Sequence, residues 1–346
     1  MLIQFKVVIP IVELSLMFFT NKDLIMKMFG YDDLRVSYRH CLSLRRENRI
    51  KATDFLTPLS AMRRDQKMSD ELHGWGLSFR KVSGLLFPER NWKVIEKEVG
   101  DKIRTLYIPN KGLSKIQSKI MCRLLYLLMP KNFYPATAYF PGCSVIKNAE
   151  YHRDSHSSLV VDIKDAFESV RTKHVYRFLR RRLPTQSEEV HKLISKLLTY
   201  CGRLRLGPSI SPKLFNLMMM ELDAKILELI KSFPGMVYTR YADDLCFSSS
   251  EDWFPVQEIR WRLKSILESY GLRLNVKQKI GRHGNMEFPG VFVTNGRLTA
   301  TMEVIRRFSE VRYDSGEARG FYSFFKQFSR ASRKKIMKIS NELVGV

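Results

Sequence analysis

Apolar and polar residues alternate in some stretches of this chain and follow a helical spacing in others. Residues 102–109 alternate with period two, which is typical of a half-buried strand, and residues 113–129 have the spacing of an amphipathic helix. The apolar, β-branched run at 159–161 predicts a buried strand. Further helices are expected over residues 172–182, 187–200, 212–231 and 255–270, short strands around 272–275 and 288–293, and basic helices towards residue 346, with residues 1 to about 85 mainly helical.

Two adjacent acids, Asp243 and Asp244, lie between two strand-forming stretches and predict a hairpin. Neighbouring side chains of a strand face opposite ways, but the twist of a tight hairpin can bring both carboxylates to one rim. Asp162 ends the upstream apolar run and can lie beside them on a neighbouring strand. An ordinary acidic turn is the alternative for the hairpin acids taken alone.

Three oxygen ligands at one place suit Mg2+, which prefers carboxylates and keeps positions open for water and phosphates. Two such ions about 4 Å apart form a clamp for in-line displacement at phosphorus. One would activate the attacking hydroxyl and the other would stabilise a pyrophosphate leaving group. The sequence therefore predicts a two-ion Mg2+ centre at Asp162, Asp243 and Asp244.

The charge balance points to a polyanionic partner. The 346 residues include 59 Lys+Arg against 35 Asp+Glu, a formal net charge of +24. A surplus of this size disfavours the compact state unless phosphates neutralise it, although a basic solvated surface is the alternative. The basic residues are spread along the chain, which suits a long groove better than a tail. Lys102 and Arg104 share one face of the predicted strand, where they would either hold a triphosphate or be solvated.

Cysteine usage and hydropathy favour a cytoplasmic protein. The five cysteines have no C-x-x-C spacing, so neither a disulfide framework nor a zinc finger is indicated. The apolar stretch at residues 2–19 is interrupted by Lys6, Pro10 and Glu13. We therefore expect a buried strand or helix there and no membrane association.

The order of these pieces, from about residue 80 to beyond 320, resembles a reverse transcriptase of the retron type found in bacteria. Asn148-Ala149-Glu150-Tyr151-His152, just before the first acid, fits the Asn-Ala-x-x-His signature of that family. The resemblance implies an α+β, right-hand polymerase fold whose palm contains an antiparallel sheet. It divides the chain into an N-terminal helical region (1–79), fingers (80–158 and 172–205), palm (159–171 and 206–292) and a short helical thumb (293–346).

The resemblance also implies roles for single residues. Asp162 and Asp243 would be the essential metal ligands, supported by Asp244. Phe167 would lie under the incoming sugar and exclude a 2'-hydroxyl, although plain core packing is its alternative. The other implied positions are triphosphate and nucleotide contacts at Lys102, Arg104 and Gly207, RNA contact or support at Asn148 and His152, and a lysine, Lys277 or Lys279, that protonates the leaving pyrophosphate.

Two positions depart from the family pattern. Leu206 stands where the family usually has Gln before the loop glycine, and Phe288-Pro289-Gly290 replaces the common Val-Thr-Gly. An apolar side chain at 206 cannot hydrogen-bond nucleotide or template. Neither departure affects the metal ligands, but the second leaves room for a divergent branch of the family.

The resemblance implies an RNA-directed DNA polymerase that uses dNTPs to copy a dedicated structured noncoding RNA into a small RNA-linked DNA. It further implies work in defence against phage, together with an effector protein. One alternative keeps the chemistry in a non-retron defence, maturase-like or diversity-generating enzyme. The other is a catalytically silent RNA-binding protein that keeps the polymerase fold.

Overall fold

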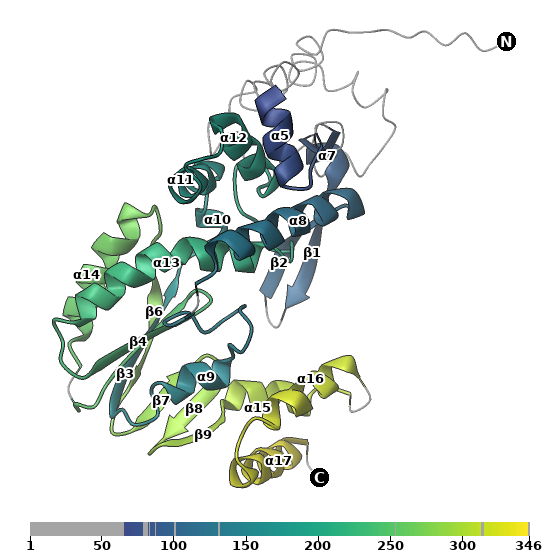
Figure 1. Ribbon diagram of the computed structural model, residues 1–346. Helices are drawn as coiled ribbons and strands as arrows, with labels where there is room; N and C mark the ends of the chain where they lie inside the picture. Colours follow the sequence, from purple (N-terminus) through teal and green to yellow (C-terminus); the bar gives the residue numbers. More distant parts are fainter. Residues whose placement is uncertain are drawn as a thin grey trace. The chain divides into compact units, whose positions relative to one another are not determined.

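The computed structural model describes residues 66–78, 82, 84–86, 88–99, 102–130, 132–252, 254–312 and 315–344 (Figure 1). Contacts between Cα atoms divide the chain into two compact units. The first comprises residues up to Arg123 together with Arg171–Pro208, and the second comprises Leu124–Val170 and Ser209–Val346. Most of the predicted N-terminal helical region lies outside the described residues.

The first unit combines a β-hairpin with helices. Its described elements are α5 (Gln66–Gly74), the 3-10 helix η1 (Gly84–Leu86), α7 (Pro88–Asn91), β1 (Trp92–Val99), β2 (Lys102–Pro109), most of α8 (Lys111–Leu128), α11 (Thr172–Arg182) and α12 (Glu188–Leu197). The strands β1 and β2 pair antiparallel, with Lys97 opposite Arg104. Helix α12 begins after Ser187, whose hydroxyl accepts from the backbone N–H of Val190 as an N-cap.

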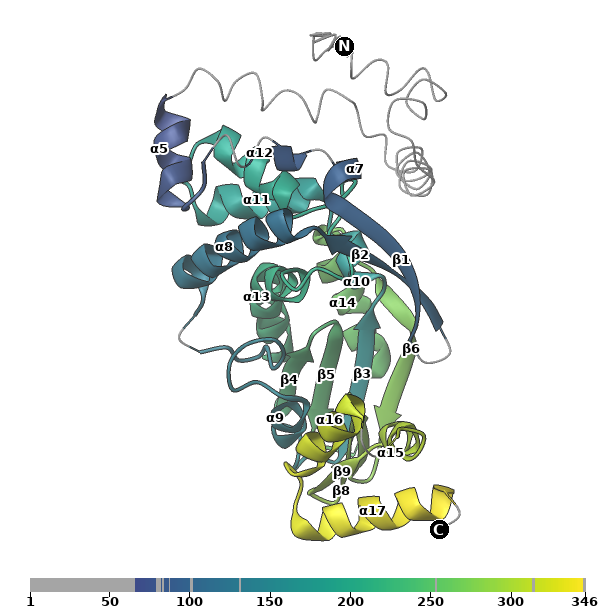
Figure 2. The ribbon, with the colours of Figure 1, turned by 90° about the vertical axis from the view of Figure 1, so that its right-hand side faces the viewer.

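The second unit holds two antiparallel sheets with helices. Its elements are α9 (Val145–Glu150), β3 (Ser157–Ile163), α10 (Ala166–Ser169), α13 (Ser211–Ile230), β4 (Met236–Tyr241), β5 (Asp244–Ser249), α14 (Val256–Ser269), β6 (Leu274–Gly281), β7 (Asn285–Phe288), β8 (Val291–Thr294), β9 (Arg297–Ala300), α15 (Met302–Ser309), α16 (Gly316–Phe325) and α17 (Arg330–Val344). Figure 2 shows four strands of the larger sheet side by side in the order β4, β5, β3, β6. The smaller sheet has the order β7, β8, β9.

One face of the larger sheet packs on α13. Tyr238 of β4 stacks on Phe247 of β5 at 4.9 Å between ring centroids, and the Tyr238 hydroxyl donates to Asp223 of α13. Apolar residues recur along α13 at helical spacing, so one stripe of this helix is buried. The buried apolar side chains of α13 are Leu214, Phe215, Leu217, Met218, Met219, Leu222, Ile226 and Ile230. Met218 and Met219 therefore pack in the core.

The opposite face of the larger sheet contributes to a second core. Because successive strand residues face opposite sides, Val160 of β3 and Cys246 of β5 point away from α13. They pack with apolar side chains of α9, of the smaller sheet and of the C-terminal helices α15 to α17. This core joins the C-terminal helices to the part of the unit that carries the acids.

The expected elements after residue 100 are present, with small shifts of their ends. One boundary differs because long-range pairing extends a strand: β6 continues to Gly281, where it pairs with β3. The short strands expected around 288–293 are present as the hairpin of β7 and β8, which turns at Pro289 and Gly290. Gly290 has φ +70°, a conformation that favours glycine. Within the described residues, no helix combines the length and hydropathy needed to cross a membrane.

Candidate active site

The register of the larger sheet brings the predicted acids together. Asp162 of β3 lies directly opposite Asp244 of β5, and side chains of directly opposed antiparallel residues project from the same face. Asp243 belongs to the two-residue loop between β4 and β5, and its carbonyl accepts from the N–H of Ile163 at 3.1 Å. The three acids therefore lie at one end of the sheet, each partly exposed.

One carboxylate oxygen of this group has no hydrogen-bond partner and could bind a cation. The amide of Asn275 in β6 donates to Oδ2 of Asp162 at 3.0 Å, whereas Oδ1 of Asp162 is buried and has no hydrogen-bond partner. Burial raises the pKa of Asp244 to about 7, and the nearby charges of Asp243 and then Asp162 add to this, with Lys279 opposing it. A divalent ion would relieve this concentration of negative charge and satisfy the orphaned oxygen.

The donor set is that of a hard cation. All three side chains offer carboxylate oxygens, and no His or Cys competes at the register positions of the acids. In the part of the chain that the structure describes, no group of three or more His, Cys, Asp or Glu side chains is placed so that it could hold a metal ion. Three carboxylates would in any case leave coordination positions to water and substrate oxygens.

Asn148 and His152, predicted as RNA contacts or as support, are both fully buried. The Asn148 carbonyl oxygen accepts from the hydroxyls of Thr137 and Thr239, at 2.9 and 2.7 Å. The two ring nitrogens of His152 lie 2.7 Å from the hydroxyls of Ser248 and Thr239. These contacts tie the signature to β4 and β5 and favour the support role, because neither side chain presents an exposed atom to RNA.

Burial also sets the charge of His152. Desolvation lowers the pKa of its imidazole to about 3, so the ring is neutral at physiological pH. The ring stacks on Phe288 of β7, with 4.5 Å between centroids. His152 thus contacts both sheets of the second unit.

Phe167 lies in α10, shortly after Asp162 in the chain. Its ring meets that of Phe215 of α13 edge-on, at 5.4 Å between centroids, and the side chain is only half-buried. The contact with Phe215 limits the positions open to the Phe167 ring. This arrangement is compatible with the predicted contact to a sugar as well as with packing.

Gly207, in the first unit, has a structural reason to be glycine. Its φ is +124°, and a Cβ there would lie 2.5 Å from the carbonyl oxygen of Tyr107 in β2. Leu206 accepts from the N–H of Tyr107 through its backbone carbonyl, at 2.8 Å, so this bond does not depend on the side chain at 206. Lys102 begins β2, and Arg104 on the same strand is exposed.

Both candidate lysines lie on β6 and are exposed. Lys279 forms an ion pair with Glu287 of β7, and its charge acts on Asp244.

Sequence reasoning assigned no role to Asn275, Tyr139 or Arg240. Asn275 ends the short strand expected around 272–275, so its polar side chain at a strand position was the available signal. Tyr139 is 42% exposed, and partial desolvation together with the charges of Asp243 and Asp244 raises its pKa to about 12. Arg240 directly precedes the Tyr-Ala-Asp-Asp stretch and is fully buried.

Comparison with known proteins matches residues 95–291, more than half of the chain, to the family described as Reverse transcriptase (RNA-dependent DNA polymerase). Retron Ec86 reverse transcriptase of Escherichia coli is 27% identical over 74% of this chain and 82% of its own length. Retron Mx162 reverse transcriptase of Myxococcus xanthus is 28% identical over 56% of this chain, which spans only 44% of that relative.

Solved structures of telomerase also align with the chain. Telomerase from Candida albicans in complex with a fragment of telomeric RNA aligns with a TM-score of 0.43 and 12% identity, covering 63% of this chain and 49% of that one. Apo telomerase from Candida tropicalis aligns with a TM-score of 0.47 and 11% identity, covering 74% and 57%. These TM-scores are too low to support a conclusion about this chain.

The family match confirms the expected α+β polymerase fold and the enzyme class, a nucleotidyltransferase that synthesises DNA on RNA. Relatives from two bacterial genera carry retron names, in agreement with the Asn-Ala-x-x-His signature. This chain therefore belongs to the reverse transcriptase (RNA-dependent DNA polymerase) family and is of the retron type.

Proposed function

We propose that this protein copies a dedicated structured noncoding RNA into a small DNA that stays linked to RNA, and that Asp162, Asp243 and Asp244 form its catalytic centre. The register pairing of Asp162 with Asp244, beside the hairpin loop that holds Asp243, carries the proposal. These three side chains offer oxygen ligands at one end of one sheet.

The acids would hold two Mg2+ ions, with Asp162 and Asp243 as the main ligands and Asp244 in support. The orphaned Oδ1 of Asp162 supports this assignment because a buried carboxylate oxygen needs a partner. When bound, such a pair of ions supplies activation of the priming hydroxyl and stabilisation of the pyrophosphate leaving group.

Other residues would position the substrates. The exposed Arg104, with Lys102 on the same strand, would neutralise the triphosphate, and the Gly207 loop would lie under nucleotide and template. The exposed part of Phe167 would meet the sugar and reject ribonucleotides. Lys277 or Lys279 would donate a proton to the leaving pyrophosphate.

The nature of the template rests on the retron relatives and on charge. A formal net charge of +24 suits a long polyanion, and RNA affinity should fall steeply with added salt as counterions are released. The proposal also includes a role in defence against phage, an effector protein as partner and a cytoplasmic location.

The proposed domains are fingers at 80–158 and 172–205, a palm at 159–171 and 206–292, and a thumb at 293–346.

Nucleotide incorporation tests the catalytic centre. The full chain, supplied with a primed RNA and dNTPs, should extend the primer only when Mg2+ is present, and Asp243→Ala and Asp244→Ala should each reduce the extension. Asp154→Ala is the matched control because Asp154 is exposed and lies outside the sheet. A wild-type chain that binds RNA but extends no primer would instead favour the catalytically silent RNA-binding protein.

Sequencing of RNA that copurifies with the chain tests the template. One dominant structured RNA, covalently continuous with a short DNA, is the expected product. A diverse RNA population with an active polymerase would contradict a dedicated template and favour a maturase-like enzyme.

A further inference from the structure

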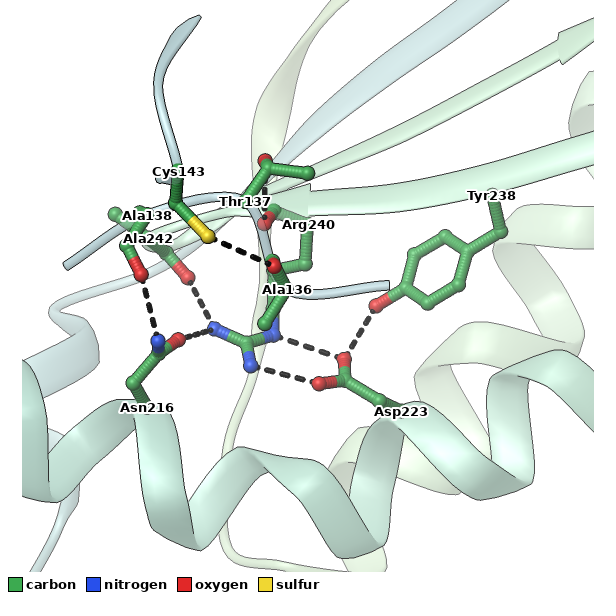
Figure 3. Close-up of polar contacts among 9 residues, drawn as sticks. All are labelled: Ala136, Thr137, Ala138, Cys143, Asn216, Asp223, Tyr238, Arg240 and Ala242. Atoms are coloured by element: carbon green, nitrogen blue, oxygen red, sulfur yellow. Dashed lines mark hydrogen bonds and ion pairs between the residues drawn. The ribbon is translucent and has the colours of Figure 1, made fainter. Parts of the chain in front are cut away.

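A charged pair lies buried beneath the acid-bearing hairpin. The side chain of Arg240 is 0% exposed and that of Asp223 is 2% exposed. The guanidinium grips the carboxylate with two parallel hydrogen bonds, from Nε to Oδ1 at 2.8 Å and from Nη2 to Oδ2 at 2.7 Å (Figure 3). Such a bidentate pair fixes both distance and plane.

The third arm of the same guanidinium reaches the hairpin loop. Nη1 of Arg240 donates to the carbonyl oxygen of Ala242 at 3.0 Å and to Oδ1 of Asn216 at 2.6 Å. Ala242 has φ +58°, a left-handed conformation that is unfavourable for a residue with a Cβ. The loop therefore keeps a strained residue immediately before Asp243, and a buried hydrogen bond holds the carbonyl of that residue.

The backbone of Arg240 fixes the loop that precedes α9. Its N–H donates to the carbonyl of Pro135 at 2.9 Å, and its own carbonyl accepts from the N–H of Thr137 at 2.8 Å. The amide of Asn216 donates to the carbonyl of Ala138 at 2.8 Å, so α13 holds the same loop from another direction (Figure 3). Arg240 thus connects α13, the hairpin and the 135–138 segment.

Stabilisation of the fold does not by itself explain why a buried Arg–Asp pair lies here. A buried ion pair can often be replaced by apolar side chains without loss of stability, because desolvation offsets the attraction between the charges. Lysine could pair with Asp223, but it lacks the planar fork that reaches a carboxylate and a separate carbonyl at once. Only arginine makes all these bonds together, which suggests a role in the geometry of the loop.

We propose that Arg240 is a positioning residue for DNA synthesis, held by Asp223 so that it fixes the carbonyl of Ala242 and hence the loop that carries Asp243 and Asp244. The inference rests on the proposed catalytic centre. It predicts that loss of the Arg240 to Ala242 bond slows chemistry while substrate binding and the fold remain.

Three variants of the full chain separate positioning from stability. Arg240→Lys keeps the charge beside Asp223 but cannot keep both sets of bonds. The double variant Arg240→Met with Asp223→Leu replaces the pair by apolar side chains of similar size. Tyr238→Phe is the matched control, because it removes one hydrogen bond to Asp223 and leaves the bond to Ala242 intact.

Each variant is assayed by single-nucleotide incorporation, thermal unfolding, RNA affinity and hydrogen exchange of the peptide spanning 241–245. In Arg240→Lys and in the double variant we expect kcat to fall at least about tenfold. KM for dNTP should stay within about twofold, since the contacts to substrate are unaltered. Exchange in the 241–245 peptide should become faster in both and stay unchanged in Tyr238→Phe, which should also keep its kcat.

The results that would overturn the inference are equally specific. A folded Arg240→Lys protein with wild-type kcat and wild-type exchange at 241–245 would contradict it, as would an equal loss of kcat in Tyr238→Phe. If the double variant does not fold, Arg240→Lys and the exchange measurement still decide the question. An active Asp243→Ala protein would instead refute the proposed catalytic centre, so the two failures are distinguishable.

Discussion

Acidification should destabilise this protein through His152, the buried histidine of the Asn-Ala-x-x-His signature. In the folded state desolvation lowers the pKa of His152 from 6.5 to about 3, because the ring is fully buried between hydroxyls and Phe288. In the unfolded chain the imidazole returns to a pKa near 6.5. Between these two pKa values the imidazole is protonated in the unfolded state and neutral in the folded state. The free energy of unfolding therefore decreases as the pH falls.

The size of the effect follows from the two pKa values. Above pH 6.5 the ring is neutral in both states and the contribution is constant. Each pH unit below 6.5 then costs about 1.4 kcal/mol until the folded pKa near 3 is reached. Between pH 7.5 and 5.0 the loss attributable to His152 is about 2 kcal/mol, a sizeable part of the stability of a typical domain.

Urea unfolding of the full chain at pH 7.5 and pH 5.0 measures this loss. His152→Gln keeps hydrogen-bonding capacity but cannot titrate, so its stability should fall by about 2 kcal/mol less than that of the wild type over the same interval. Comparing the two proteins cancels the contributions of all other titrating groups, including Asp244. His283→Gln is the control, since it makes the same change at a histidine whose side chain is 80% exposed.

Equal losses in wild type and His152→Gln would refute the reasoning. They would mean that the imidazole titrates in the folded protein as it does in water. A histidine accessible in that way could meet RNA directly, and the support role inferred from its contacts would be lost.

Three further substitutions test other parts of the structure. Asp162→Asn should abolish primer extension yet leave RNA affinity within about twofold, since it removes a metal ligand and not the basic surface; loss of RNA binding would argue against this role. Phe167→Ala should admit ribonucleotides, measured as the ratio of dNTP to rNTP incorporation, and an unchanged ratio would leave Phe167 as core. Gly207→Ala should cost at least about 2 kcal/mol in urea unfolding, because its Cβ would collide with the Tyr107 backbone. Gly74→Ala, with open space around its Cβ, is the control.

The sequence by itself determined the local elements and was enough to predict the family. Periodicity depends on neighbouring residues, so the helix at α13 and the hairpin around Asp243 could be predicted from the pattern alone. The types of the three acids were enough to predict a hard cation. The order of these pieces was enough to predict the family, which the match over residues 95–291 confirms.

Only the tertiary structure decided which side chains meet. Strand register depends on hydrogen bonds between residues far apart in the chain, and it alone places Asp162 opposite Asp244. Burial likewise depends on the whole fold. The sequence left open whether His152 contacts RNA or supports the fold, and the structure shows its ring nitrogens next to the buried hydroxyls of Thr239 and Ser248. The pairing of Arg240 with Asp223 could not be predicted from the sequence pattern, because it requires α13 to pack on a particular face of the sheet.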